Sequence, residues 1–253
     1  MVEIRNLHAG YDEKNVLKGL SLSFPKGQVT VILGPNGCGK STLLKSLVGL
    51  TPRVSGEIRM DGLLHTGLSR GEVARKIAYL PQNKTAGDMT VEQLVLHGRF
   101  PYLRYPRRYR PEDRQAAKQA MAQLGLEHLA GEPLNRLSGG TRQKCFIAMA
   151  LAQDAPTILM DEPLSFLDIS HQLKLLTLCR QLAAEGKAVV LVLHDLALAL
   201  EYAHRVVLME AGTVRQVGTP EEILSTGNLE QVFGVKVSTH RWENRLHITF
   251  DSL

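Results

Sequence analysis

The segment from Val29 to Leu47 constrains the fold more than any other part of the chain. An apolar, β-branched run, Val29–Leu33, is followed by Gly-Pro-Asn-Gly-Cys-Gly-Lys-Ser and then by an apolar helical stretch. Glycines let the backbone fold tightly so that consecutive N–H groups face one anion, and the following helix adds the positive end of its dipole. The strand–loop–helix order fits the phosphate-binding pattern G-x-x-x-x-G-K-[ST], and we favour it over a glycine-rich turn that binds nothing.

The loop residues have separable expected roles. Lys40 is expected to reach the β- and γ-phosphates of a nucleotide, and Ser41 to hold Mg²⁺. Cys38 lies beside helix N–H groups that favour a thiolate, so we expect alkylation to inhibit and bound nucleotide to protect. The phosphate cradle is predicted to comprise Gly34, Pro35, Asn36, Gly37, Cys38, Gly39, Lys40 and Ser41.

Composition sets broad limits on the class of protein. The 253 residues suit one large α/β domain or a core with a sub-domain, and 44% apolar residues are enough for a sizeable core. A net charge of +5 is compatible with nucleic acid or an anionic membrane surface without deciding between them. The three cysteines lack metal or disulfide spacing, which favours a reducing cytosol. We find no signal peptide and no apolar run of bilayer length.

Hydrophobic patterning predicts a mostly parallel sheet with an insertion. Residues 1–33 read as short strands joined by turns, and apolar strands alternate with helices again after Pro156, which implies a sheet covered on both faces. About sixty helical residues, from Thr90 to Ala152, interrupt this pattern and suggest an inserted helical sub-domain. The later expected elements are strands Thr157–Met160, Ala188–Leu193 and Val206–Met209, helix Gln172–Ala184, a helix from Pro220, and two terminal strands around 240–242 and 246–250.

Polar residues follow several of these strands and point to phosphate chemistry. Asp161 and Glu162 end one buried strand, where they would support Mg²⁺ and polarise a water, respectively. His194 ends the next strand and would donate to the γ-phosphate, whereas a lone histidine is usually structural. Gln82 would reach Mg²⁺ or the water with its amide. A solvated Asp-Glu loop is the alternative that the neighbouring phosphate loop disfavours.

A second candidate anion site precedes the helical run from Arg142 to Ala152. Leu137-Ser138-Gly139-Gly140-Thr141 places small residues at a helix N-terminus. One phosphate loop suffices for one triphosphate. We therefore expect the second site to serve a nucleotide held by another copy of the chain.

Taken together, these residues resemble an ABC-transporter ATPase subunit over nearly the whole chain. By that resemblance, Gly34 to Thr42 is the Walker A loop and Leu159 to Glu162 the end of Walker B. Ser138, Gly139 and Gly140 belong to the ABC signature, and His194 is the switch histidine. The remaining assignments are the Q-loop (Gln82), the D-loop (Ser165 to Asp168) and the aromatic residue that stacks on adenine (Tyr11).

The resemblance implies a P-loop NTPase (RecA-like) α/β core with a mostly parallel sheet, an N-terminal antiparallel β sub-domain and an inserted α-helical sub-domain. Residues 1–84 and 155–253 would form the core with the β sub-domain, and 85–154 the helical sub-domain. A head-to-tail homodimer would sandwich two ATP molecules. Thr141, where glutamine is common, and Leu164, after the proline of Walker B, depart from the pattern.

The stretch from Val95 to Tyr102 is similar to ATPases that serve iron–siderophore, haem and cobalamin importers. The resemblance implies Mg²⁺-dependent ATP hydrolysis, two integral-membrane permease subunits, an indirect substrate-binding protein and a peripheral place on the cytoplasmic face of the inner membrane. The alternative is a soluble ABC ATPase acting on ribosomes or DNA. Such proteins usually carry two ATPase halves or coiled-coil insertions, which this sequence lacks, so we expect no nucleic-acid partner.

Residues 99–110 carry five arginines interleaved with aromatic residues and prolines. This stretch would bind single-stranded nucleic acid by stacking and charge, dock on a membrane subunit or lipid head groups, or form a solvated loop. We favour the membrane alternatives.

Overall fold

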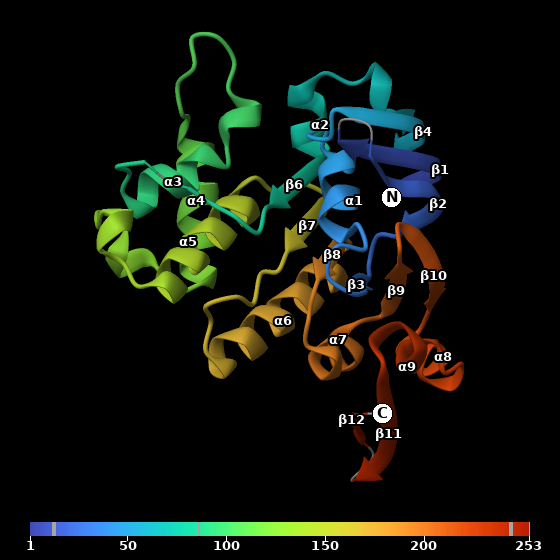
Figure 1. Ribbon diagram of the computed structural model, residues 1–253. Helices are drawn as coiled ribbons and strands as arrows, with labels where there is room; N and C mark the ends of the chain where they lie inside the picture. The colour runs from blue at the N-terminus through green and yellow to red at the C-terminus, as the bar shows by residue number, and fades with distance from the viewer. Residues whose placement is uncertain (12–13, 86, 243–244, 253) are drawn as a thin grey trace.

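The computed structural model describes residues 1–11, 14–85, 87–242 and 245–252. Its centre is a six-stranded sheet in which five neighbouring strands run parallel, and the last, β10, pairs antiparallel with β9 at one edge (Figure 1). This confirms the mostly parallel sheet. The strand order is β10 (Thr213–Gly218), β9 (Arg205–Glu210), β3 (Val29–Leu33), β8 (Ala188–Val192), β7 (Thr157–Asp161) and β6 (Ile77–Leu80).

Both faces of this sheet are buried. Because side chains alternate along a strand, Val31 and Leu33 enter one apolar cluster and Ile32 enters another. The first cluster includes side chains of α5 (Gly139–Ala152), α6 (Ile169–Ala184) and α7 (Leu196–Tyr202). The second includes the apolar face of α1 (Lys40–Leu47) and the inner face of a separate antiparallel sheet. The all-apolar strands therefore follow from burial on two sides.

The N-terminal antiparallel sheet has four strands in the order β2-β1-β4-β5. β1 (Val2–Tyr11) and β2 (Lys14–Phe24) are much longer than the short strands that patterning predicted. Register shifts in the pairing of β1 with β2 break the period-two alternation, which explains why the sequence pattern predicted only short strands here. The other two strands are β4 (Arg53–Met60) and β5 (Leu63–Leu64).

Three helices pack on one another beside the main sheet and occupy the left of Figure 1. They are α3 (Val91–His97), α4 (Pro111–Gln123) and α5. A Cβ built on Gly98 would lie 2.1 Å from the carbonyl oxygen of Met149, so glycine is required where α3 meets α5. The predicted helical region is thus three helices joined by loops and by the short 3₁₀ turns η2 (Phe100–Tyr102), η3 (Glu127–Leu129) and η4 (Leu134–Arg136).

Several boundaries differ from the predicted ones. α6 begins at Ile169, three residues before Gln172, because the Asp168 carboxylate caps it by accepting from the His171 N–H. α2 (Arg70–Lys76), preceded by η1 (His65–Gly67), was not predicted, although Ser69 and Glu72 form a capping box. The chain ends with α8 (Pro220–Ser225), α9 (Asn228–Phe233), β11 (Val235–Trp242) and β12 (Arg245–Ser252), and no described helix has the length and apolarity of a bilayer span.

Candidate active site

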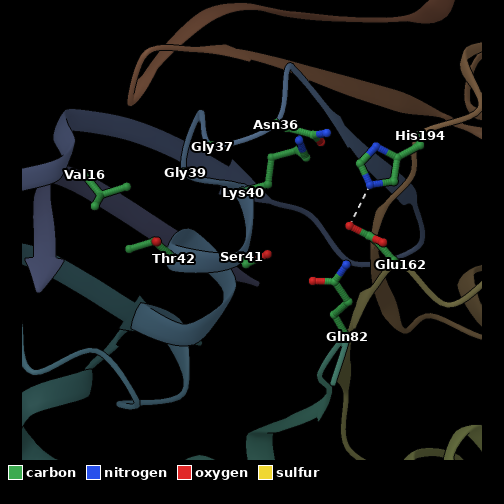
Figure 2. A pocket seen from close by; sticks show the side chains of 10 residues that line it. All are labelled: Val16, Asn36, Gly37, Gly39, Lys40, Ser41, Thr42, Gln82, Glu162 and His194. Atoms are coloured by element: carbon green, nitrogen blue, oxygen red, sulfur yellow. Dashed lines mark hydrogen bonds and ion pairs between the residues drawn. The ribbon is translucent and has the colours of Figure 1, made fainter. Parts of the chain in front are cut away.

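A cavity of about 700 Å³ opens at the carboxyl ends of the parallel strands. Figure 2 shows the phosphate loop along one side of the opening and polar side chains from neighbouring strand ends on the other. Ligands bind in this position in open α/β sheets. The lining residues are Val16, Asn36, Gly37, Gly39, Lys40, Ser41, Thr42, Gln82, Glu162 and His194.

The phosphate loop holds a backbone shape that only glycine adopts at low cost. Gly37 and Gly39 have φ values of 78° and 107°, and Gly39 is the N-cap of α1. At Gly34 a Cβ would lie 2.3 Å from the carbonyl oxygen of Met209. The loop is therefore fixed tightly between the sheet and α1. The first turn of α1, where helix N–H groups lack intrahelical partners, lines the cavity.

Lys40 is only 6% exposed, and its ammonium has no carboxylate partner within the described residues. Its Nζ donates to the carbonyl oxygens of Gly34 and Pro35 at 2.6 and 2.9 Å. Carbonyl dipoles satisfy the hydrogen-bonding need of this cation but leave its charge uncompensated. An anionic ligand in the loop would compensate it.

Glu162 and His194 lie next to each other on one side of the cavity. They follow β7 and β8, which are paired in parallel with Asp161 opposite Val192. His194 Nε2 and Glu162 Oε1 lie 2.6 Å apart (Figure 2). Glu162 has a φ of 51°, unusual for a residue with a side chain, and its N–H is held by the carbonyl of Val192 at 3.2 Å. The strand ends therefore bring these two predicted residues into direct contact.

Asp161 is more deeply buried, at 1% exposed, and its Oδ1 has no hydrogen-bond partner among the described residues. Burial raises the pKa of this carboxyl, and a hydrogen bond from the Ser41 hydroxyl opposes the shift. A buried, unpaired carboxylate oxygen beside a serine hydroxyl is an oxygen-rich donor set of the kind that Mg²⁺ prefers. The predicted metal residues Asp161 and Ser41 thus lie together, with Gln82 on the rim of the same cavity.

A series of hydrogen bonds that the sequence did not reveal begins at Lys84, two residues after Gln82. Lys84 Nζ donates to Gln143 Oε1 at 2.5 Å, and Gln143 Nε2 donates to the carbonyl of Pro163 at 2.7 Å. The three residues come from the loop after β6, from α5 and from the turn after β7. Burial lowers the pKa of Lys84 to about 8, and the charge of Asp161 opposes this shift. These hydrogen bonds thus link α5 to the carbonyl of Pro163, the residue that follows Glu162.

The glycine-rich turn at the start of α5 lies outside the main cavity. Ser138 caps α5 by accepting from the Thr141 N–H, and the two hydroxyl oxygens are 3.0 Å apart. Gly140 approaches the Phe166 backbone so closely that a Cβ would lie 2.8 Å from its carbonyl oxygen. A second cavity, of about 290 Å³, joins this turn to the loop of Gln82 and Lys84.

Asp168, Tyr11 and Pro35 are among the predicted ligand residues that lie outside the lining of the main cavity. Asp168 is an exposed cap of α6 and binds the His171 ring. Tyr11 ends β1, about one-third exposed, and the described lining includes Val16 of β2 rather than Tyr11. Apolar Val16 carries no chemical signal in the sequence. Pro35 lies in the loop but offers the cavity only the carbonyl already bound by Lys40.

The expectation of a reactive Cys38 thiolate is wrong. The side chain is 5% exposed and points beneath the loop, where its Sγ would contact a Cβ on Gly34. Burial raises the pKa of the thiol, and the nearby charge of Lys40 only partly opposes this. Desolvation of the thiolate outweighs the helix N–H groups on which the expectation rested.

Known proteins are similar to this chain in sequence and architecture. The sequence profile described as ABC transporter matches residues 17–165, which hold the phosphate loop, the glycine-rich turn and Glu162. This chain belongs to the ABC transporter family. The ferric enterobactin transport ATP-binding protein FepC of Escherichia coli K12 is 42% identical over 91% of this chain and 86% of its own length. The iron(3+)-hydroxamate import ATP-binding protein FhuC of Bacillus subtilis 168 is 37% identical over 97% and 93%.

Solved structures agree with the family assignment. An inward-facing putative metal-chelate type ABC transporter has a chain that superposes with a TM-score of 0.84 at 30% identity, covering 100% of this chain and 97% of that one. The dimeric bacterial ABC transporter cassette MJ0796 superposes with a TM-score of 0.76 at 28% identity, covering 87% and 99%. The predicted ABC ATPase fold is confirmed, and ATP is the nucleotide that this domain binds.

Proposed function

We propose that this chain is the ATP-binding and ATP-hydrolysing subunit of an ABC importer for an iron–siderophore, haem, cobalamin or similar metal chelate. The observation that carries the ATPase part is the meeting of Lys40, Glu162 and His194 in one cavity. The names of relatives at 37–42% identity support the cargo class. These relatives are transport subunits, which disfavours the alternative of a soluble ABC ATPase on ribosomes or DNA.

In the proposed reaction, the phosphate loop and Lys40 bind the β- and γ-phosphates, and water attacks the γ-phosphorus in line. Glu162 orients the water and accepts its proton, while His194 donates a hydrogen bond to the γ-phosphate oxygens. Their 2.6 Å contact means that bound ATP would compete with Glu162 for His194, which frees the carboxylate to meet the water. The enzyme contributes positioning and electrostatic stabilisation.

The donor set of Asp161 and Ser41 fits Mg²⁺. We propose that these two residues, with Gln82, hold the ion. When bound, it would neutralise charge on the phosphate oxygens. Thr42 and the loop glycines complete the cradle, and Tyr11 remains our candidate for stacking on adenine.

The other half of each ATP site is proposed to come from a second copy. Ser138, Gly139 and Gly140 lie outside the cavity of their own chain, and a dimeric arrangement of a cassette with this fold is known. We propose a head-to-tail homodimer in which this turn covers the nucleotide of the partner and Asp168 lies at the contact. Residues 85–154 would move as the helical sub-domain against the core formed by 1–84 and 155–253.

The dimer is proposed to work with two integral-membrane permease subunits at the cytoplasmic face of the cell membrane. A substrate-binding protein would act indirectly, through the permease. Gln82 lines both the nucleotide cavity and the second cavity that reaches α5, so movement at its loop would carry the nucleotide state to the surface.

Affinity purification tests this proposal. A tagged Glu162→Gln chain is captured from detergent-solubilised membranes with ATP, and Lys40→Ala serves as the matched control that fails to retain nucleotide. We expect a polytopic permease to copurify with the first variant, and its binding protein to identify the cargo. Ribosomal or DNA-repair proteins in place of a permease would overturn the transport assignment and leave the ATPase chemistry standing.

A further inference from the structure

The segment between α3 and α4, residues 99–110, projects from the helical region as a long loop (top left in Figure 1). We call it the arginine loop. Its root is firmly held: Arg99 is 13% exposed, and its Nε donates to the buried Asp113 Oδ1 at 3.0 Å. The same guanidinium donates to the carbonyl of Ala152 at 3.0 Å and lies over the Tyr102 ring at 4.0 Å. Of the five arginines, Arg99 therefore stabilises the fold.

A second set of contacts sets the direction of the loop. Arg75 of α2 donates to the carbonyl of Pro101 at 3.2 Å, and the rings of Phe100 and His97 stack with centroids 5.9 Å apart. Prolines at 101 and 106 restrict the backbone further. Because its root is fixed by polar contacts at several points, the loop presents its far end in a defined direction.

The far end is basic and aromatic. Arg104, Arg107 and Arg108 are exposed, and none of them forms an ion pair within the part of the chain that the structure describes. Tyr105 is 97% exposed, more than any other large apolar side chain described. The acidic residues nearest in the sequence, Glu112 and Asp113, form ion pairs with Arg110 and Arg99. The tip therefore carries three uncompensated positive charges around a tyrosine.

We propose that the tip of the arginine loop binds the anionic phospholipid head groups of the membrane beside the permease. Guanidinium groups form forked hydrogen bonds with phosphate oxygens, and tyrosine places its ring at the head-group level with its hydroxyl in water. The proposal rests on the proposed function only in that it places the subunit at a membrane.

Charge and shape favour lipid head groups over single-stranded nucleic acid and over a protein partner. A single-stranded nucleic-acid site needs a groove that follows the backbone and several rings for successive bases. Here Phe100 and Tyr102 are engaged with Arg107 and Arg99, which leaves Tyr105 as the one free ring of the described tip. A protein partner would require matching acids on its own surface, whereas an anionic bilayer presents phosphates wherever the loop lands.

Vesicle co-sedimentation of the whole chain tests the proposal. The vesicles contain equal parts of phosphatidylcholine and phosphatidylglycerol, with pure phosphatidylcholine as the neutral reference. The test variant carries Arg104→Gln, Arg107→Gln and Arg108→Gln. The matched control carries Arg5→Gln, Lys18→Gln and Lys236→Gln, which removes the same charge from exposed positions elsewhere. ATPase turnover and thermal unfolding of both variants check that each is folded.

We expect the unchanged chain to bind the anionic vesicles and not the neutral ones. The test variant should bind on the order of a hundredfold more weakly, the control nearly as well as the unchanged chain, and Tyr105→Ser with a smaller loss. Equal weakening of test and control variants would show a diffuse charge effect and overturn the proposal. Failure of the unchanged chain to bind anionic vesicles would also overturn it. If the test variant lost permease copurification but still bound vesicles, the loop would bind a protein partner, and the proposal would again be wrong.

Discussion

The cavity around Lys40 and the glycine-rich turn at Ser138 are both proposed sites for anions, yet they differ in how complete they are. In the cavity, a phosphate loop, a buried carboxylate and the Glu162–His194 pair converge from neighbouring strand ends. The turn offers one capped helix end close to Phe166, and the described lining of its own cavity adds two cationic residues, Arg142 and Lys84.

This difference supports the proposal that a second copy completes each site. The cavity brings together the groups proposed to bind phosphate, water and metal, but the glycine-rich turn of the same chain lies outside it. The turn has donors that a nucleotide would use but no phosphate cradle. Since water exclusion strengthens electrostatic stabilisation, joining the two regions across two copies would complete each site.

The largest expected effect belongs to the cavity alone. Glu162→Gln removes the proton acceptor and keeps the size of the side chain, so turnover should fall by roughly 10²- to 10⁴-fold with ATP binding preserved. Steady-state ATPase assays and equilibrium nucleotide binding measure the two quantities. Glu222→Gln, at a capping box of α8, is the matched control and should keep its turnover. Normal turnover of the Glu162 variant would remove this residue from the reaction.

Lys40→Ala tests the binding half of the cavity. Losing a charge-assisted hydrogen bond to phosphate should weaken ATP affinity by roughly tenfold to a hundredfold. Isothermal titration measures this, with exposed Lys118→Ala on α4 as the control. If Lys40→Ala bound ATP as tightly as the unchanged chain, the phosphate loop would not be the nucleotide site.

A smaller effect is expected where the two regions communicate. Lys84→Met removes the hydrogen bond from Lys84 to Gln143. Gln143 in turn donates to the carbonyl of Pro163, and so positions the backbone next to Glu162. We expect kcat to fall roughly two- to tenfold, the value of one hydrogen bond, with KM unchanged. Lys84→Arg should recover most of the loss because it keeps a cationic donor. A change in KM alone, or no recovery by arginine, would contradict a positioning role.

The smallest effect concerns Cys38. Because burial raises its pKa, the reactive thiolate is scarce at neutral pH and increases as the pH rises toward the raised pKa. Alkylation should therefore be slower than that of an unperturbed exposed thiol at pH 7 and accelerate with pH, as followed by mass spectrometry. Cys38→Ser should abolish the adduct at this position. Fast alkylation at neutral pH would restore the thiolate interpretation.

Local patterns predicted the parts of the site that are local in the chain. The phosphate loop could be predicted because its backbone shape demands glycines at fixed spacing. Glu162 and His194 could be predicted to lie close together because strand ends gather at one edge of a parallel sheet. The Lys84–Gln143–Pro163 contacts could not be read, since their partners are 59 and 20 residues apart. Val16 was missed because an apolar residue in a strand looks like part of the core. The predicted start of α6, Gln172, is three residues too late, because Asp168 was not interpreted as the cap of this helix.

The most direct test of the central claim is the ATP-dependent assembly of two copies. Light scattering of the Glu162→Gln chain with ATP should show a doubling of molecular mass, which Ser138→Arg, added to the same chain, should abolish without loss of ATP binding. Doubling that persists in the Ser138→Arg variant, or a mass that stays monomeric while ATP is bound, would contradict a site completed by the glycine-rich turn of a second copy.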